Sequence, residues 1–133
     1  MAEVMTVSQF AKRADVAPHV IRYYARIGLL KPRRSGSGYK LFAAADVKRL
    51  HFIHLAKALG FTLDEIAEIF HESSHGKSPC PSVREIIRRR IDENGRALGE
   101  LRALQRRMES AAAQWEEMPD GMPDGDTVCH LIE

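Results

Sequence analysis

Two cysteines are the residues of this chain best suited to chemistry. Cys80 and Cys129 are its only cysteines, and His130 directly follows the second one. Thiolate sulfur and imidazole nitrogen are donors that bind thiophilic divalent metals. Two thiols can also be oxidised to a disulfide. The cysteines therefore predict a metal site or a redox-active thiol pair. An enzyme is not expected, because the sequence shows no pairing of a nucleophile with a base, no phosphate-cradling glycine loop and no paired carboxylates.

A long helix is predicted between the two cysteines. Pro81 suits a first helical turn, and no further proline occurs before Pro119. Steps of four and three residues, typical of a coiled-coil seam, connect nine positions after Pro81. These are Ile87, Ile91, Asn94, Leu98, Leu101, Gln105, Met108, Ala112 and Trp115. A helix over 81–117 would be about 55 Å long, too long for the rest of this short chain to cover. We expect it to pair with a second copy, and packing within its own subunit is the alternative.

The segments on either side of this helix are polar. Residues 73–80 form a linker, and residues 118–133 open with two Met-Pro-Asp-Gly turns, at Met118 and Met122. A short apolar turn with Cys129 and His130 at its centre follows. The chain therefore places one thiol at each end of the predicted helix.

Charge is distributed unevenly along the 133 residues. The net charge is +2, but residues 1–57 carry 11 Lys and Arg against 3 acids, which is +8, and the remainder carries 9 against 15, which is −6. A basic N-terminal part favours a nucleic acid as partner over a membrane surface. No run of about 18 apolar residues and no signal-peptide pattern is present. We therefore expect a cytoplasmic protein with no membrane partner.

The basic part begins with the pattern of a helix-turn-helix. Ser8 is the expected N-cap of a first helix, and Pro18 suits the start of a second one that Gly28 ends. In the second helix His19 and Arg22 remain available for an outer face, together with Tyr23 and Arg26. Such a helix can enter the major groove of DNA.

A short hairpin, or wing, is predicted after this motif. Arg33 and Arg34 precede a Gly/Ser turn, and Tyr39 and Lys40 follow it. These cations are suited to phosphate oxygens, and Tyr39 to a phosphate or sugar contact. A solvated charge run is the alternative.

Two further helices are expected to connect this head to the long helix. Gly60 ends the first of them, and Thr62 and Glu65 have the capping-box spacing that begins the second. Lys57, near the end of the first, could contact a phosphate, and a merely solvated lysine is the alternative.

Four motifs in this order resemble the MerR (mercury-resistance regulator) family of bacterial transcription factors. They are Arg22-Tyr23-Tyr24, Ile27-Gly-Leu-Leu, Gly38-Tyr39-Lys40 and Gly60-Phe-Thr-Leu-Asp-Glu-Ile. The resemblance implies a mainly all-α fold, with a winged helix-turn-helix DNA-binding head over 1–72, a linker over 73–80, an antiparallel coiled-coil dimerisation helix over 81–117 and an effector-binding loop over 118–133. Phe42 stands where many members have tyrosine, so a hydroxyl contact there is lost. The residues expected to bind DNA are His19, Arg22, Tyr23, Tyr24, Arg33, Arg34, Tyr39, Lys40 and Lys57.

The resemblance also implies a mechanism. In this family a homodimer binds promoter DNA with an overlong spacer and distorts it when the effector binds, so that RNA polymerase can read both promoter elements. In metal-sensing members a cysteine at the start of the dimerisation helix joins cysteines in the loop of the other subunit. Cys80 matches the pattern linked to divalent ions, but the loop here has one cysteine where two are expected.

The effector therefore stays open among several candidates. Two thiolates suffice for Hg(II), whereas Zn(II), Cd(II) or Pb(II) need further ligands. The expected metal ligands are Cys80, Cys129 and His130, with His75, Asp124 and Asp126 as further candidates. A thiol-based redox or electrophile sensor of the same fold and an effector-independent DNA-bending protein are the alternatives.

Overall fold

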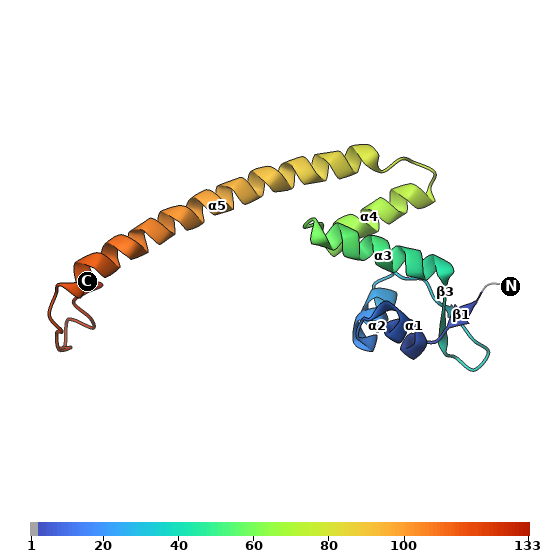
Figure 1. The fold of residues 1–133 in the computed structure, drawn as a ribbon, viewed down its shortest axis with the longest axis horizontal. Helices are drawn as coiled ribbons and strands as arrows, with labels where there is room; N and C mark the ends of the chain where they lie inside the picture. Colours follow the sequence, from blue (N-terminus) through green and yellow to red (C-terminus); the bar gives the residue numbers. More distant parts are fainter. Residues whose placement is uncertain (1–2) are drawn as a thin grey trace. The chain divides into compact units, whose positions relative to one another are not determined.

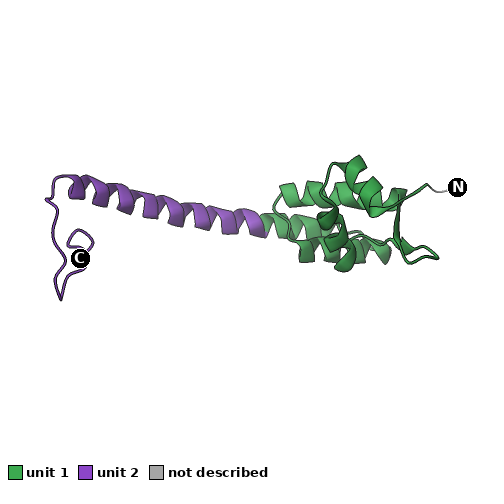
Figure 2. Ribbon diagram, turned by 90° about the horizontal axis from the view of Figure 1, so that it is seen from below, with its two compact units in different colours: residues 1–88 green, residues 89–133 purple. Residues whose placement is uncertain are grey.

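The computed structural model describes residues 3–133 and is mainly helical, with one small sheet (Figure 1). It divides into two compact units, residues 1–88 and 89–133 (Figure 2). The elements are β1 Val4–Met5, α1 Val7–Ala14, α2 Pro18–Arg26, β2 Arg33–Arg34, β3 Lys40–Ala43, α3 Ala44–Ala58, α4 Leu63–Ser74 and α5 Cys80–Glu116. The predicted fold class is confirmed. The predicted linker is shorter than expected, because α4 continues to Ser74 and Cys80 is already helical.

The first helix begins earlier than its predicted cap. Thr6 is the N-cap of α1: its hydroxyl accepts the N–H of Gln9 at 3.3 Å, and the Gln9 side chain accepts the Thr6 N–H at 2.9 Å. The prediction of Ser8 was wrong, because the reciprocal bonds of this capping box place Ser8 inside the helix. Pro18 opens α2 as predicted.

The wing is a three-stranded antiparallel sheet in the order β1-β3-β2. Arg33 pairs with Leu41 and Arg34 with Lys40, so β2 and β3 form the predicted hairpin. The strand β1 pairs Met5 with Phe42 along the other edge of β3. Two residues are too few to show an alternating pattern, so β1 was not predicted.

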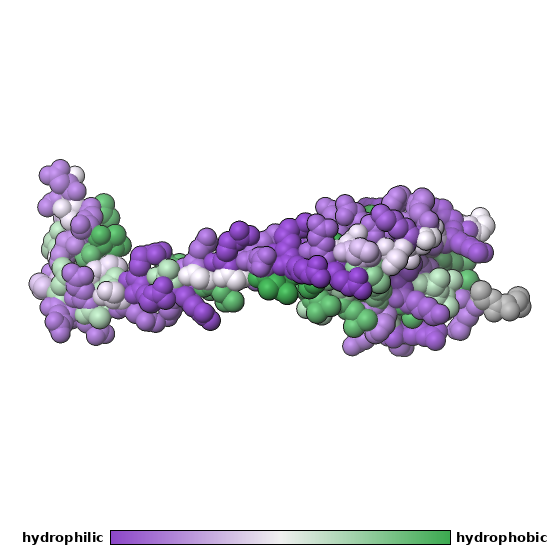
Figure 3. Space-filling model, turned by 90° about the horizontal axis from the view of Figure 1, so that it is seen from above, coloured by the Kyte–Doolittle hydropathy of each residue, from purple (hydrophilic) through white to green (hydrophobic). Residues whose placement is uncertain are grey.

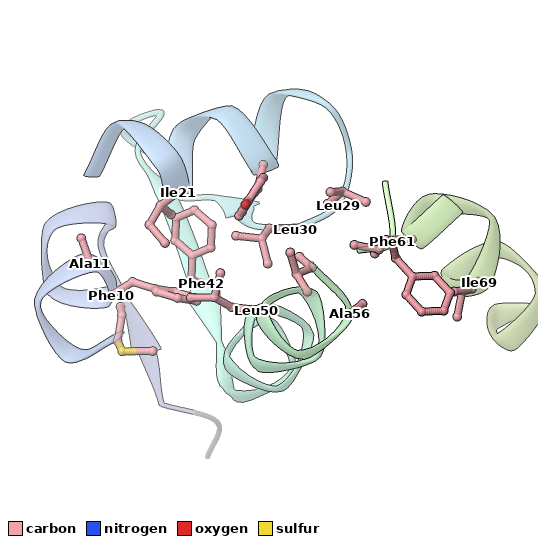
Figure 4. Packing of buried hydrophobic residues seen from close by; sticks show 14 of the residues in the cluster. Phe10, Ala11, Ile21, Leu29, Leu30, Phe42, Leu50, Ala56, Phe61 and Ile69 are labelled. Atoms are coloured by element: carbon pink, nitrogen blue, oxygen red, sulfur yellow. The ribbon is translucent and has the colours of Figure 1, made fainter. Parts of the chain in front are cut away.

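One hydrophobic core holds the first unit together (Figure 4). Phe42 is completely buried, and its ring meets that of Phe10 edge to face with centroids 5.1 Å apart. This contact locks β3 against α1, and an apolar ring at position 42 fits the site because a buried hydroxyl would need a hydrogen-bond partner. Ile86 of α5 is buried in the same core. The first turns of the long helix therefore fold with the head.

A buried acid and a half-buried arginine hold the segment that follows α2. Asp46 is 4% exposed, and its two carboxylate oxygens accept the backbone N–H groups of Lys31 at 2.9 Å and Ala43 at 3.1 Å. Arg49 donates from Nε to the Leu29 carbonyl at 2.8 Å. Burial lowers the pKa of the Arg49 guanidinium, and the charge of Asp46 opposes that shift. These contacts tie the α2–β2 connection to α3.

Beyond its first turns α5 presents apolar side chains to solvent. The helix has 37 residues, and Ile86 is its one buried residue. Large apolar residues are exposed along it, and Figure 3 shows apolar residues gathered on one side of it. They are Ile91, Leu98, Leu101, Leu104 and Met108. Nothing lies within 4 Å of a Cβ placed at Gly95 or Gly99. No helix within residues 3–133 is long and apolar enough to cross a membrane.

Candidate DNA-binding surface and candidate thiol site

Helix α2 presents one charged and aromatic face to solvent. His19, Arg22, Tyr23 and Arg26 are exposed, and their spacing of three, four and seven residues places them on one side of a helix. The Arg26 guanidinium lies over the Tyr23 ring at 5.2 Å from its centroid. This face offers hydrogen-bond donors and an aromatic ring to a groove of DNA.

Tyr24 lies on the opposite side of α2 from Tyr23. It is 5% exposed and belongs to the hydrophobic core, as does Ile21 one turn earlier. Its carbonyl accepts the N–H groups of Leu29 at 2.9 Å and Leu30 at 3.2 Å. The ring of Tyr24 thus packs in the core and positions the helix that carries Tyr23, and a DNA contact by Tyr24 stays a prediction.

The wing holds its predicted residues on a turn closed by several hydrogen bonds. Tyr39 is 69% exposed, and its N–H donates to the Ser35 hydroxyl at 3.1 Å while its carbonyl accepts the Ser35 N–H at 2.7 Å. Arg34 donates from Nη1 to the Gly38 carbonyl at 3.3 Å. Gly38 has φ +87, a left-handed conformation that favours glycine. Arg33 remains exposed, and Lys40 is half-buried.

Lys57 is exposed near the C-terminal end of α3. Its carbonyl accepts the N–H of Gly60, which has φ +90 and ends the helix in a tight turn. Three exposed cations of one compact unit come from different elements: Arg22 from α2, Arg33 from β2 and Lys57 from α3. The geometry is that of a winged helix-turn-helix.

Two family descriptions match the chain. The "MerR HTH family regulatory protein" description matches residues 5–73, and the "MerR, DNA binding" description matches residues 47–111. The chain belongs to the MerR family. This MerR-family protein is a DNA-binding transcriptional regulator and not an enzyme.

Known relatives cover most of this MerR-family chain. The HTH-type transcriptional regulator HmrR of Rhizobium leguminosarum bv. viciae is 31% identical over 118 residues, which span 87% of this chain and 92% of HmrR. The mercuric resistance operon regulatory protein of Bacillus cereus is 31% identical over 101 residues, 75% of this chain and 76% of that protein. The crystal structure of PbrR691 from Ralstonia metallidurans CH34 in complex with lead(II) has a TM-score of 0.77, with 26% identity over 96% of each chain.

The two thiols lie in different units, and each has its own surroundings. Cys80 is the first residue of α5; its thiol is free and exposed, and its N–H donates to the Ser78 hydroxyl at 3.3 Å. Cys129 is free and half-buried. The Glu133 carboxylate accepts the N–H groups of Val128 and Cys129, both at 3.0 Å, and the Glu133 N–H donates to the Cys129 carbonyl at 3.2 Å. Glu133 therefore holds the backbone of the loop thiol.

His130 is fixed through one ring nitrogen. Its Nε2 lies 2.9 Å from the Pro119 carbonyl, and because a carbonyl only accepts, Nε2 carries the proton and Nδ1 keeps its lone pair. A Cβ at Gly121 would overlap this imidazole. The glycine therefore leaves the space that His130 fills, and the loop keeps a metal-competent nitrogen beside Cys129.

Asp124 and Asp126 differ in the hydrogen bonds and exposure of their side chains. One Asp124 oxygen accepts the N–H groups of Asp126 and Thr127, both at 2.8 Å. These two backbone bonds, from Asp126 first and then Thr127, lower the pKa of the Asp124 carboxyl. Asp124 is thus a turn-forming residue with one oxygen left over. The Asp126 side chain is exposed.

The metal-ligand prediction is not completed within one chain. Among residues 3–133, no three His, Cys, Asp or Glu side chains gather closely enough to hold an ion. His75, a further predicted ligand, caps α4 and contacts His71. The roles of Glu133 and Gly121 were not predicted, because both depend on contacts within an irregular loop that has no periodic pattern.

Proposed function

We propose that the protein is a metal-responsive transcriptional activator that binds promoter DNA as a homodimer. The observation that carries the proposal is the placement of its two free thiols, one beginning α5 and one in the segment after α5. One relative is a mercuric resistance operon regulatory protein, and one structural relative was solved with lead(II). Sulfur donors favour the same class of ion, a thiophilic divalent metal such as Zn(II), Cd(II), Pb(II) or Hg(II).

The exposed stripe on α5 supports the homodimer. A helix of 37 residues is about 55 Å long at 1.5 Å per residue, and its apolar side chains need a partner of similar length. In an antiparallel pair, the first residue of each helix lies beside the last turn of the other. Cys80 of one protomer would then lie near the C-terminal segment of the second copy, which carries its own Cys129.

The donor residues of the chain fit a shared site of this kind. Cys80 and Cys129 supply two thiolates, enough for linear coordination of Hg(II). His130 supplies a third donor through Nδ1, because its Nε2 is held by Pro119. Asp126, or the spare oxygen of Asp124, is available for ions that prefer four ligands. A bound ion would link the two protomers where their helices end.

The head supplies the contacts with DNA. The exposed face of α2 is suited to the major groove, and the wing cations and Lys57 to phosphates on either side. Bending and untwisting a promoter spacer costs about 1–6 kcal/mol, so effector binding must favour the distorting conformation by a comparable amount. We infer that this distortion lets RNA polymerase engage both promoter elements.

A metal titration of the purified, reduced protein tests the proposal. Hg(II), Pb(II), Cd(II) and Zn(II) are added separately, thiolate-to-metal charge transfer is followed by absorbance, and ions are counted per dimer. We expect Cys80→Ser and Cys129→Ser each to abolish the charge-transfer band and metal-induced transcription in vitro. Met122→Leu is the matched control, because it removes an exposed sulfur from the same loop without removing a thiol.

The result that overturns the proposal is unchanged metal-dependent transcription in both cysteine variants. A redox or electrophile sensor is the competing function, because two free thiols can also be oxidised to a disulfide; the relatives linked to mercury and lead favour the metal. Mass spectrometry after oxidant treatment would then reveal a Cys80–Cys129 disulfide between chains, with transcription responding to oxidant and not to metal.

A further inference from the structure

Two histidines lie one helical turn apart at the end of α4. His71 and His75 are both exposed, and their rings are in contact, with centroids 4.2 Å apart and planes inclined by 43°. The i, i+4 spacing places both side chains on one face of the helix. Pairs of histidines with this spacing are a recurrent metal-binding arrangement in helices.

Hydrogen bonding fixes which nitrogen of His75 can bind an ion. Its Nδ1 lies 2.8 Å from the His71 carbonyl, which can only accept. Nδ1 therefore carries the proton and donates, and Nε2 keeps its lone pair. The Ser74 hydroxyl donates to the same carbonyl at 2.8 Å. A histidine whose second nitrogen donates to a carbonyl has the arrangement common among metal ligands.

His71 has no competing use for its ring. Its ring lies against that of His75, and within residues 3–133 it makes no hydrogen bond to a side chain or backbone group. The helix C-terminus also favours positive charge, because its last carbonyls carry the negative end of the helix dipole. This field favours a cation bound beside the two imidazoles.

The surroundings are open enough for an ion with bound water. The histidines line a cavity of about 240 Å³ together with Gly28, Leu29 and Lys31. Arg49 lines it too, but its guanidinium is held by the Leu29 carbonyl and the Phe70 ring. The other cation that lines the cavity is Lys31. Its ammonium repels a bound metal ion and lowers the affinity of the site without blocking the imidazoles.

We propose that His71 and His75 form a second metal site, a two-imidazole site for a borderline divalent cation such as Cu(II), Ni(II) or Zn(II). Water completes the coordination. The site needs neither thiol and lies beside the Gly28–Leu29 turn that follows α2, so it is independent of the proposed Cys80 and Cys129 site. Its ion would bind at the DNA-reading head itself.

Cu(II) titration of a thiol-free protein tests this inference. The full chain with Cys80→Ser and Cys129→Ser, without a histidine tag, is titrated with Cu(II), and electron paramagnetic resonance counts the coordinating nitrogens. Cu(II) is the probe because it has the highest affinity in the divalent series. We expect one ion per chain with two imidazole nitrogens, and a loss of affinity of about tenfold or more in His71→Gln and in His75→Gln.

The control is His54→Gln, which removes an exposed histidine from α3 in the same unit. We expect it to leave Cu(II) binding unchanged. Equal binding in the parent, His71→Gln and His75→Gln proteins would overturn the inference. Binding of inorganic phosphate to the two histidines, with no binding of Cu(II), would also overturn it. That result would identify an anion site formed with Lys31. Circular dichroism of each variant checks that α4 remains folded.

Discussion

Replacing Asp46 by alanine is expected to destabilise the head strongly. The carboxylate is 4% exposed and accepts backbone N–H groups from Lys31 and Ala43. Its removal leaves both backbone donors without their partner. Each buried unsatisfied donor costs about 1–3 kcal/mol. Arg49 also loses the negative charge of Asp46, which favours its charged form. Two such donors sum to about 2–6 kcal/mol. Because Lys31 and Ala43 line an open cavity that water can enter, we expect the free energy of unfolding to fall by the lower part of that range, about 2–4 kcal/mol.

Urea unfolding followed by circular dichroism measures this change. Protein concentrations are matched, because the unfolding of an associating chain depends on concentration. The control is Asp64→Ala, an exposed acid in the first turn of α4, whose loss removes only a helix-dipole interaction of about 0.3–1 kcal/mol. Asp46→Asn keeps one acceptor oxygen and should lie between the two. The reasoning is refuted if Asp46→Ala costs no more than Asp64→Ala.

Two further predictions concern the different burial of Tyr23 and Tyr24 and the protonation of Asp124. Tyr23→Ala should weaken promoter binding in a fluorescence anisotropy assay while leaving the free energy of unfolding almost unchanged, whereas Tyr24→Ala should cost about 3–5 kcal/mol of stability; equal effects on stability would contradict the burial of Tyr24. The pKa of the Asp124 carboxyl is lowered in the folded loop. The stability that this carboxylate adds to the loop is therefore fully present above the pKa of the carboxyl in the unfolded chain. It is lost as the pH falls through the pKa of the carboxyl in the folded loop. Amide resonances of Asp126 and Thr127 should therefore shift together below pH 4 in the native chain, and an Asp124→Asn chain whose amides shift in the same way would disprove the assignment.

Much of the head could be predicted because its signals are local. Pro18 and Gly28 mark the ends of α2, and the stripe on α5 follows from a spacing that needs no tertiary information. The same periodicity could also have separated Tyr23 from Tyr24. Ile21 and Tyr24 are three residues apart and both face the core, whereas the motif that names both tyrosines says nothing about which side each occupies.

The candidate thiol site was less predictable. Cys80 and Cys129 are visible as residue types, but the contact of Glu133 with the Cys129 backbone and of His130 with Pro119 arises in an irregular loop. Such contacts depend on the exact path of the chain. The contact between His71 and His75 could have been predicted from the sequence, since an i, i+4 pair on a helix is a local signal.

The exposed stripe of α5 has a consequence for the lifetime of the protein in a cell. Gly95 and Gly99 lie inside the helix, and each weakens a solitary helix by about 1 kcal/mol relative to alanine. If the proposed homodimer forms, a chain that has not yet paired would keep this helix only marginally, and its backbone would open to proteases. Pairing would remove that exposure, so degradation would be fastest when the protein is scarce. The amount of regulator would then rise more steeply with gene copy number than its rate of synthesis does.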